Sequence, residues 1–277
     1  MPHKFTTQEF LDAKKTGRKI TMLTAYDYTM AQILDESGID AILVGDSLAM
    51  PIQGRASTLE VTIDEMLYHC RCVERGIKTT MLVGDMPFLT YHICPEEAVR
   101  NAGRFIQEGK VNAVKLEGGK LMAPTVKAIV RSQIPVMGHI GLTPQSINVF
   151  GGFKVQGKEA HAAKALLEDA LALEEAGAFA IVLEAVPEKL AKLITEKVSI
   201  PTIGIGAGKY CDGQILVLHD MLGLYADFTP KFVKQYAKLR GAMAEAVTAY
   251  ISEVKLQQFP DRQHTFTICD DVLEKLY

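Results

Sequence analysis

Two aspartates that directly follow short apolar runs are candidate metal ligands. Asp46 and Asp85 each come after a Val-Gly pair that ends such a run. Magnesium prefers oxygen ligands and is usually held by one or two carboxylates together with water and substrate. The pair therefore predicts a divalent-metal site, provided that the fold brings the two carboxylates together. The alternative is that each aspartate caps its following helix, because Asp is a favoured N-cap residue.

Lys115 and Glu117 lie two residues apart in a further apolar run. In a strand, side chains at this spacing leave the same face. Because acidic residues end the neighbouring runs, we expect Lys115 to stay charged and to bind an anionic substrate. The alternative for Lys115 is a Schiff base with a carbonyl substrate.

Glu184 and His139 end two more apolar runs. A carboxyl in apolar surroundings has a raised pKa and can act as a general base near neutral pH, which is the role we expect for Glu184. A solvated loop acid is the alternative. His139 is expected to orient the substrate or bind the metal, and a purely structural hydrogen bond is its alternative.

Short apolar runs rich in Ile, Val and Leu recur along the chain, as is typical of parallel strands covered on both faces. Gly ends the amphipathic segment before several of them, which suits a helix C-terminus. The runs recur about every 28 residues, near the ~30 residues of one unit in a ~250-residue barrel. Eight runs are predicted as strands, at residues 20–26, 41–45, 79–84, 113–117, 135–139, 180–184, 201–206 and 214–219.

The helices between these strands have apolar faces and recognisable starts. Thr62 and Glu65 form a capping box, and Thr229-Pro230 is expected to open the last helix, whose face would include Phe232 and Ile251. No linker rich in Pro, Gly or Ser divides the chain, so we predict one α/β domain, a (β/α)8 TIM barrel. A doubly wound open sheet is the alternative, because strand count alone does not prove closure. In a barrel, the polar strand ends would meet at the C-terminal face.

Composition excludes several classes of partner. Lys and Arg number 30 against 33 Asp and Glu, which leaves no case for nucleic acid. No apolar run approaches the roughly 20 residues of a membrane helix. The five scattered cysteines and the lack of an apolar leader lead us to expect a cytoplasmic protein. The glycine-rich stretch at 204–208 fails the Walker A pattern, and we expect a tight turn there that a ligand can approach closely.

The chain resembles the ketopantoate hydroxymethyltransferase family. The resemblance rests on an ordered set of motifs that spans nearly the whole chain. These motifs are Leu23-Thr-Ala-Tyr-Asp27, Val44-Gly-Asp-Ser47, Gly84-Asp-Met-Pro-Phe88, Val114-Lys-Leu-Glu-Gly-Gly119, Gly138-His-Ile-Gly-Leu-Thr-Pro-Gln145, Leu183-Glu-Ala-Val-Pro187, Ile203-Gly-Ile-Gly-Ala-Gly208 and Asp212-Gly-Gln-Ile-Leu-Val-Leu-His-Asp-Met-Leu-Gly223.

This resemblance implies a barrel of the phosphoenolpyruvate/pyruvate superfamily and a role in pantothenate, hence coenzyme A, synthesis. It implies a Mg²⁺-assisted enolisation and aldol-type addition. A one-carbon unit would pass from 5,10-methylenetetrahydrofolate to 3-methyl-2-oxobutanoate, giving 2-dehydropantoate. It also implies a homo-oligomer, typically a decamer. A segment from about residue 260 would be a short C-terminal extension of a single domain spanning 1–277, because the chain ends later than the family pattern.

The resemblance also assigns roles to individual residues of this sequence. Glu184 matches the catalytic base. The remaining positions match metal ligands at Asp46, Asp85 and Glu117, and substrate contacts at Asp46, Ser47, Asp85, Lys115 and His139. Two alternatives stay open at this point. One is a related enzyme that cleaves C–C or P–C bonds of 2-oxo acids without folate, and the other is a barrel that has lost catalysis.

Overall fold

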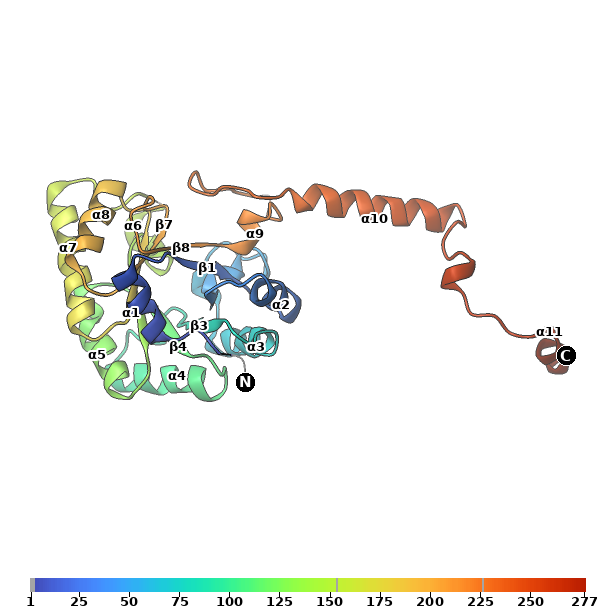
Figure 1. Ribbon diagram of the computed structural model, residues 1–277, viewed down its shortest axis with the longest axis horizontal. Helices are drawn as coiled ribbons and strands as arrows, with labels where there is room; N and C mark the ends of the chain where they lie inside the picture. The colour runs from blue at the N-terminus through green and yellow to red at the C-terminus, as the bar shows by residue number, and fades with distance from the viewer. Residues whose placement is uncertain (1–2, 153, 226) are drawn as a thin grey trace.

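The computed structural model describes residues 3–152, 154–225 and 227–277. Within them, eight parallel strands form a closed barrel in sequence order, with the first strand paired to the last (Figure 1). The predicted barrel is therefore confirmed, and the open sheet is excluded. The strands are β1 Ile20–Thr24, β2 Ala41–Val44, β3 Met81–Asp85, β4 Ala113–Glu117, β5 Val136–Gly141, β6 Ala180–Glu184, β7 Thr202–Ile205 and β8 Gly213–Leu216.

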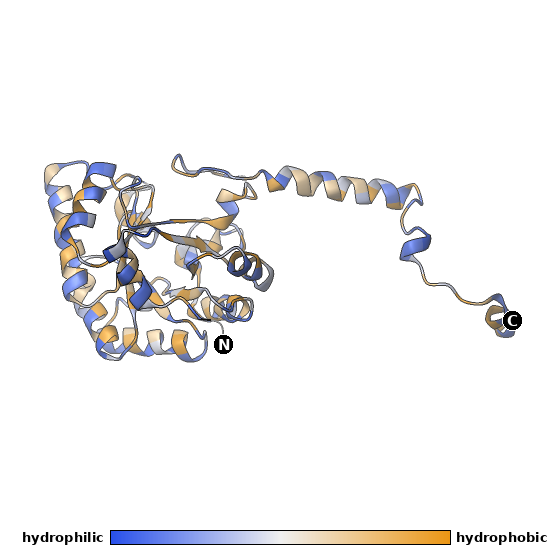
Figure 2. Cartoon of the chain, in the orientation of Figure 1, coloured by the Kyte–Doolittle hydropathy of each residue, from blue (hydrophilic) through white to orange (hydrophobic). Residues whose placement is uncertain are grey.

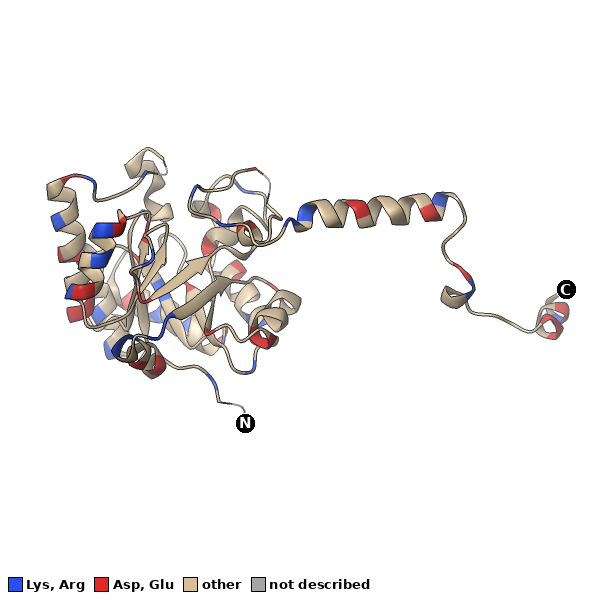
Figure 3. Cartoon of the chain, turned by 45° about the horizontal axis from the view of Figure 1, so that its top comes forward, with Lys and Arg blue, Asp and Glu red and all other residues tan. Residues whose placement is uncertain are grey.

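Helices follow the strands, and most of them cover the outside of the barrel (Figure 1). They are α1 Thr7–Thr16, α2 Tyr28–Glu36, α3 Ile63–Glu74, α4 Pro95–Gln107, α5 Ala123–Arg131, α6 Ile147–Phe150, α7 Ala160–Glu175, α8 Glu188–Lys197, α9 Leu218–Met221, α10 Leu239–Lys255 and α11 Asp270–Leu273. The capping box predicted from Thr62 and Glu65 opens α3. Acidic and basic residues are interspersed on these helices (Figure 3). Within the described residues, no helix is both long and apolar enough to cross a membrane.

Helix α1 closes one end of the barrel. Phe10 on this helix is fully buried and packs edge-on against Phe179, which directly precedes β6, with ring centroids 5.3 Å apart. Both rings belong to an apolar cluster that fills the barrel interior with side chains from the strands. Because Phe179 marks the N-terminal end of its strand, the barrel interior is filled at that end and can open toward a ligand at the C-terminal end.

The segment after β8 differs from the prediction. The last long helix begins at Leu239 rather than at Pro230. Residues before Leu239 hydrogen-bond back to α9 instead of forming helical turns, since the Tyr236 N–H donates to the Met221 carbonyl and the Leu239 N–H to the Leu222 carbonyl. This segment therefore lies over the end of the barrel.

The glycine-rich turn after β7 explains part of this course. Gly206 has φ +65°, and a Cβ there would lie 2.7 Å from a ring carbon of Phe232. The close approach that we expected of a ligand is thus made by the Phe232 ring. A glycine is required at this point because any side chain would displace that ring.

Beyond Lys238 the chain leaves the barrel. Helix α10 projects away from it and carries both apolar and polar residues along its length (Figures 1 and 2). Met243, Val247 and Ile251 on this helix are all exposed. The exposed segment thus begins well before residue 260, and the single-domain interpretation with a short extension stays a prediction.

The carboxylate of Asp35 holds the backbone that leads into β3 in place by hydrogen bonds. Asp35, at the end of α2, accepts hydrogen bonds from the backbone N–H groups of Lys78, Thr79 and Thr80 and from both threonine hydroxyls, at 2.7–3.0 Å. Although partial burial alone would raise it, these bonds lower the pKa of Asp35 to about 2. The anchor matters for the site because β3 ends at Asp85.

We expect Asp35→Asn to lower the free energy of unfolding at pH 7 by about 1–2 kcal/mol, because an amide cannot accept all of these bonds. A depressed pKa stabilises the fold above the unfolded value of 3.8, and this contribution disappears as the pH falls through about 2. Urea unfolding at pH 7 and near pH 3 measures the difference. The exposed Asp12→Asn is the control, and an equal effect of both variants would contradict the anchor.

Candidate active site

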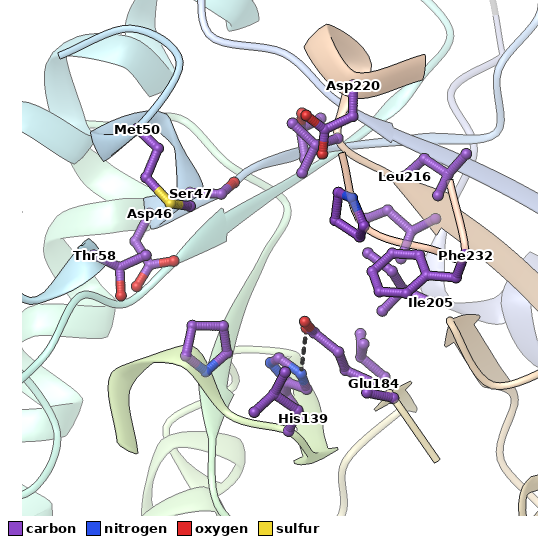
Figure 4. A pocket seen from close by; sticks show the side chains of 18 of the residues that line it. Asp46, Ser47, Met50, Thr58, His139, Glu184, Ile205, Leu216, Asp220 and Phe232 are labelled. Carbon is purple, nitrogen blue, oxygen red and sulfur yellow. Dashed lines mark ion pairs between the residues drawn. The ribbon is translucent and has the colours of Figure 1, made fainter. Parts of the chain in front are cut away.

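A cavity of about 550 Å³ opens at the C-terminal end of the barrel. Its lining includes all seven residues singled out from the sequence. Six ionisable ones, here called the charged cluster, are Asp46, Asp85, Lys115, Glu117, His139 and Glu184. All but Glu184 are at least 95% buried. Figure 4 shows His139 and Glu184 paired on one side of the cavity and Asp46 and Ser47 on another.

Strand register brings the charged cluster together. Asp85 on β3 lies beside Lys115 on β4, and Glu117 on β4 lies beside His139 on β5. Glu184 at the end of β6 pairs with Gly141 of β5. Residues from positions 85 to 184 thus become neighbours because parallel strands align their carboxyl ends.

The two aspartates do not cap helices. Gly45 is the N-cap of the short 3-10 helix that starts at Asp46, and Cys94 is the N-cap of α4, the helix after Asp85. Instead, Asp85 Oδ2 accepts the Asp46 backbone N–H at 3.2 Å, and Asp85 Oδ1 lies 2.8 Å from Lys115 Nζ. The helix-capping alternative is therefore wrong for both residues.

Lys115 is held as an ammonium ion. Burial lowers its pKa, but the carboxylates of Asp85, Glu117 and Asp46 outweigh this effect and raise the pKa above its ordinary value. A Schiff-base lysine needs the opposite shift, because only the neutral amine is nucleophilic. The electrostatics therefore favour the charged lysine over the alternative left open by the sequence.

His139 bridges the other two carboxylates. Its Nδ1 lies 3.4 Å from Glu117 Oε1, and its Nε2 lies 3.2 Å from Glu184 Oε2. Burial and the nearby Lys115 lower its pKa, yet Glu117 and Glu184 raise it to about 9. The raised pKa favours the protonated ring, whose Nε2 faces the Glu184 carboxylate, while its Nδ1 also lies 3.2 Å from Lys115 Nζ.

Ser47 is oriented from behind by a buried tyrosine. Its Oγ lies 2.9 Å from the Tyr26 hydroxyl. Desolvation raises the pKa of Tyr26, so that the phenol stays neutral and can hydrogen-bond to the serine. The Ser47 side chain lies at the cavity wall next to Asp46 (Figure 4).

Gln145 connects the cluster, although nothing in the sequence argument assigned it a role. Its Nε2 donates to Asp46 Oδ2 at 2.9 Å and to the Met86 carbonyl at 3.0 Å. Its backbone N–H donates to Glu117 Oε2 at 3.0 Å, and its Oε1 accepts the Tyr91 hydroxyl at 2.6 Å. Gln145 carries no charge and ends the motif that begins at Gly138, so a search for ionisable groups passes over it.

The negative charge of the buried acids is unfavourable unless positive charge lies close to it. Burial, and then repulsion by Asp85 and Glu117, raise the pKa of Asp46 well above its ordinary value. Oxygen donors of this kind suit a hard divalent cation. Within the described part of the chain, no three His, Cys, Asp or Glu side chains are grouped closely enough to hold a metal ion by themselves. The donor chemistry therefore fits a cation held by fewer protein ligands, with substrate or water completing its coordination.

The fold is similar to that of several solved enzyme structures. A 2,3-dimethylmalate lyase, described as a member of the PEP mutase/isocitrate lyase superfamily, aligns with a TM-score of 0.58 and 16% identity over 99% of this chain and 95% of its own. A phosphonopyruvate hydrolase in complex with oxalate and Mg²⁺ aligns with a TM-score of 0.61 and 12% identity over 97% and 93%. This likeness shows the class of fold, a (β/α)8 barrel.

Sequence comparison defines the family within this class. The profile described as ketopantoate hydroxymethyltransferase matches residues 4–262. A 3-methyl-2-oxobutanoate hydroxymethyltransferase of Clostridium beijerinckii is 61% identical over 99% of this chain and 100% of its own length, and one of Clostridioides difficile is 57% identical over the same shares. The chain belongs to the ketopantoate hydroxymethyltransferase family, so it is a transferase and the resemblance drawn from the motifs is confirmed.

We expect Gln145→Leu to lower kcat/KM by about 10–100-fold, the usual cost of losing a partner that orients a ligand group. Leucine fills similar space but leaves Asp46 Oδ2 and the Tyr91 hydroxyl without their partner. Steady-state kinetics measure the change, and thermal unfolding checks that the barrel is intact. The control is Gln107→Leu on the exposed face of α4. An unchanged kcat/KM would mean that Asp46 keeps its position without the amide.

Proposed function

We propose that the protein transfers a hydroxymethyl group from 5,10-methylenetetrahydrofolate to 3-methyl-2-oxobutanoate in this cavity and so forms 2-dehydropantoate. The name shared by the curated relatives supports this reaction. The observation that carries the proposal is the position of Glu184, whose carboxylate lies 3.2 Å from His139 Nε2 in a cavity that also holds Lys115 and two aspartates. Enolisation of a 2-oxo acid requires a base, a positively charged group such as Lys115, and acids that would hold a metal ion. This cavity combines all three.

The charged cluster would bind the 2-oxo acid. Lys115 offers a buried positive charge to the substrate carboxylate, and Ser47 offers a hydroxyl oriented by Tyr26. Both groups donate hydrogen bonds where negative charge gathers on the substrate oxygens. Such donors stabilise a developing oxyanion strongly in a cavity from which water is largely excluded.

Asp46 and Asp85 would hold a divalent cation such as Mg²⁺, with Glu117 as the further acid beside it. When bound, the cation supplies Lewis acidity that polarises the keto group of the substrate. Gln145 keeps Asp46 and Glu117 in place through its three hydrogen bonds to them and to Met86.

Glu184 would remove the proton from C3 of the substrate. His139 Nε2 lies 3.2 Å from one carboxylate oxygen of Glu184, and among the described residues no ion pair engages the other oxygen, which would take the proton. The resulting enolate carbon would then form a C–C bond to the methylene carbon while both C–N bonds of that carbon to the folate break. Water would supply the hydroxyl, and its second proton and the proton taken by Glu184 would go to the two folate nitrogens, which releases tetrahydrofolate. Lys115 and Ser47 stabilise the enolate oxygen while the C–C bond forms.

Assembly into a homo-oligomer, with a decamer implied by the resemblance, is part of the same proposal. The exposed apolar residues of α10, among them Met243, Val247 and Ile251, support it, because association would remove them from water. The cytoplasmic location expected from the sequence stays a prediction.

We expect Glu184→Gln to abolish exchange of the C3 proton, because an amide is not a base. Exchange of deuterium into 3-methyl-2-oxobutanoate, followed by NMR with Mg²⁺ and without folate, measures this step. Metal binding should change little, since Glu184 lies apart from Asp46 in the cavity (Figure 4). Glu188→Gln, at the start of α8 and outside the cavity lining, is the matched control. Exchange at the normal rate in Glu184→Gln would refute the role of this base.

We expect a chelator to abolish transfer and Asp46→Asn to weaken Mg²⁺ binding by about tenfold or more, or ~1.4 kcal/mol. Calorimetric titration with Mg²⁺ in the presence of 3-methyl-2-oxobutanoate measures this affinity. Asp64→Asn on the outside of α3 is the control. Asp85→Asn should also weaken Mg²⁺ binding. Its folding must be checked, because the substitution removes the carboxylate that pairs with the buried Lys115. Full activity of both site variants at limiting Mg²⁺ would exclude the metal assignment.

A further inference from the structure

The cavity has a second wall that the mechanism has not used. Across the cavity from Asp46, and beside Glu184, the lining is mostly apolar and aromatic with Lys231 among it, and we call this wall the aromatic rim. Its residues come from the ends of β7 and β8 and from the segment after α9, and they are Ile205, Leu216, Tyr225, Phe228 and Phe232. Figure 4 shows Ile205, Leu216 and Phe232 on this side, beside Asp220 and across from Asp46.

Phe232 has a fixed place in the rim. Its ring lies against the backbone of Gly206, at the site where a Cβ would stand 2.7 Å from the ring. The side chain is still 38% exposed, so a large part of it remains available for contact with a ligand. A flat aromatic ligand would gain both apolar burial and ring stacking at such a wall.

Asp220 is the acidic group of the rim. It lies on α9, which is fixed by a stacking contact of Tyr26 with His219 at 5.5 Å and by a hydrogen bond from the Leu218 N–H to Thr24 Oγ1 at 3.1 Å. Within the described residues, no hydrogen bond or ion pair reaches the Asp220 carboxyl, and burial alone raises its pKa to about 6. A partly buried carboxylate without partners is costly unless a ligand supplies donors.

We propose that Asp220 binds the pterin ring of the folate by accepting hydrogen bonds from its N3–H and its 2-amino group, while the ring packs against Phe232. This inference rests on the proposed function. The two pterin donors lie side by side in one plane, like the fork of a guanidinium group, and a carboxylate accepts such a pair with both of its oxygens. The wall that carries Asp46 and Asp85 suits the small oxo acid, so the two substrates take different walls, with Glu184 between them.

This arrangement gives the folate a defined orientation. With the pterin held at the rim, the one-carbon unit that it carries faces the charged cluster, where Glu184 generates the carbon nucleophile. Asp220 is thus a specificity-determining residue for the folate and takes no part in proton removal from the oxo acid.

The first test measures affinity for tetrahydrofolate by titration of the full-length protein with Mg²⁺ present. We expect Asp220→Asn to raise Kd by about 10–100-fold, as for loss of a hydrogen-bonded charged group. Asp227→Asn, in the same segment but outside the cavity lining, is the control and should bind normally. Deuterium exchange at C3 of 3-methyl-2-oxobutanoate needs no folate and reports that the variant is folded. Unchanged Kd in Asp220→Asn would overturn the proposal.

The second test is a double-mutant cycle with 2-desamino-2-methyltetrahydrofolate. The wild type should bind this analogue about 10–100-fold more weakly than tetrahydrofolate, whereas Asp220→Asn should barely distinguish the two. An equal penalty in both proteins would show that Asp220 does not contact the 2-amino group. A wild type that binds tetrahydrofolate more tightly than the analogue, but transfers no hydroxymethyl group from 5,10-methylenetetrahydrofolate, would contradict the proposed function and leave the binding role of Asp220 intact.

Discussion

The structure depends on the burial of several acidic groups at one end of a closed barrel. Asp46, Asp85 and Glu117 are almost completely withdrawn from water, and carboxylates in such a place are strongly disfavoured without compensation. Lys115 and His139 supply positive charge at 2.8–3.4 Å, and Gln145 supplies hydrogen bonds to two of the three acids. The site is therefore held in a state of excess negative charge that a cation and an anionic substrate can relieve together.

Closure of the barrel makes this arrangement possible. Parallel strands align their carboxyl ends, and the register sets Asp85 beside Lys115 and Glu117 beside His139. At the opposite end, Phe10 of α1 and Phe179 fill the interior, so solvent and ligands reach the barrel from one side. The packed interior also keeps the strands from shifting, which preserves hydrogen bonds that tolerate only small displacements.

The segment after β8 adds a wall of different chemistry. Instead of forming a helix directly, it hydrogen-bonds to α9 and lays Phe232 on Gly206. The cavity thereby combines a charged side with an aromatic side, which is a natural division for two substrates of unlike polarity. Helix α10 then leaves the barrel with apolar residues exposed, and these residues are available for association between copies of the chain.

The sequence by itself determined the eight strands, the class of fold and the family, because strand periodicity and short motifs are local properties. It also pointed to the seven residues that line one cavity, since polar groups at strand ends stand out against apolar runs. Tertiary structure alone decided that Gln145 connects Asp46 with Glu117 and that Phe232 lies on Gly206 rather than in a helix. It also decided that Asp220 faces the cavity with no hydrogen-bond partner among the described residues. These facts arise from contacts between residues up to 99 positions apart, and no local pattern encodes which distant groups a side chain will meet.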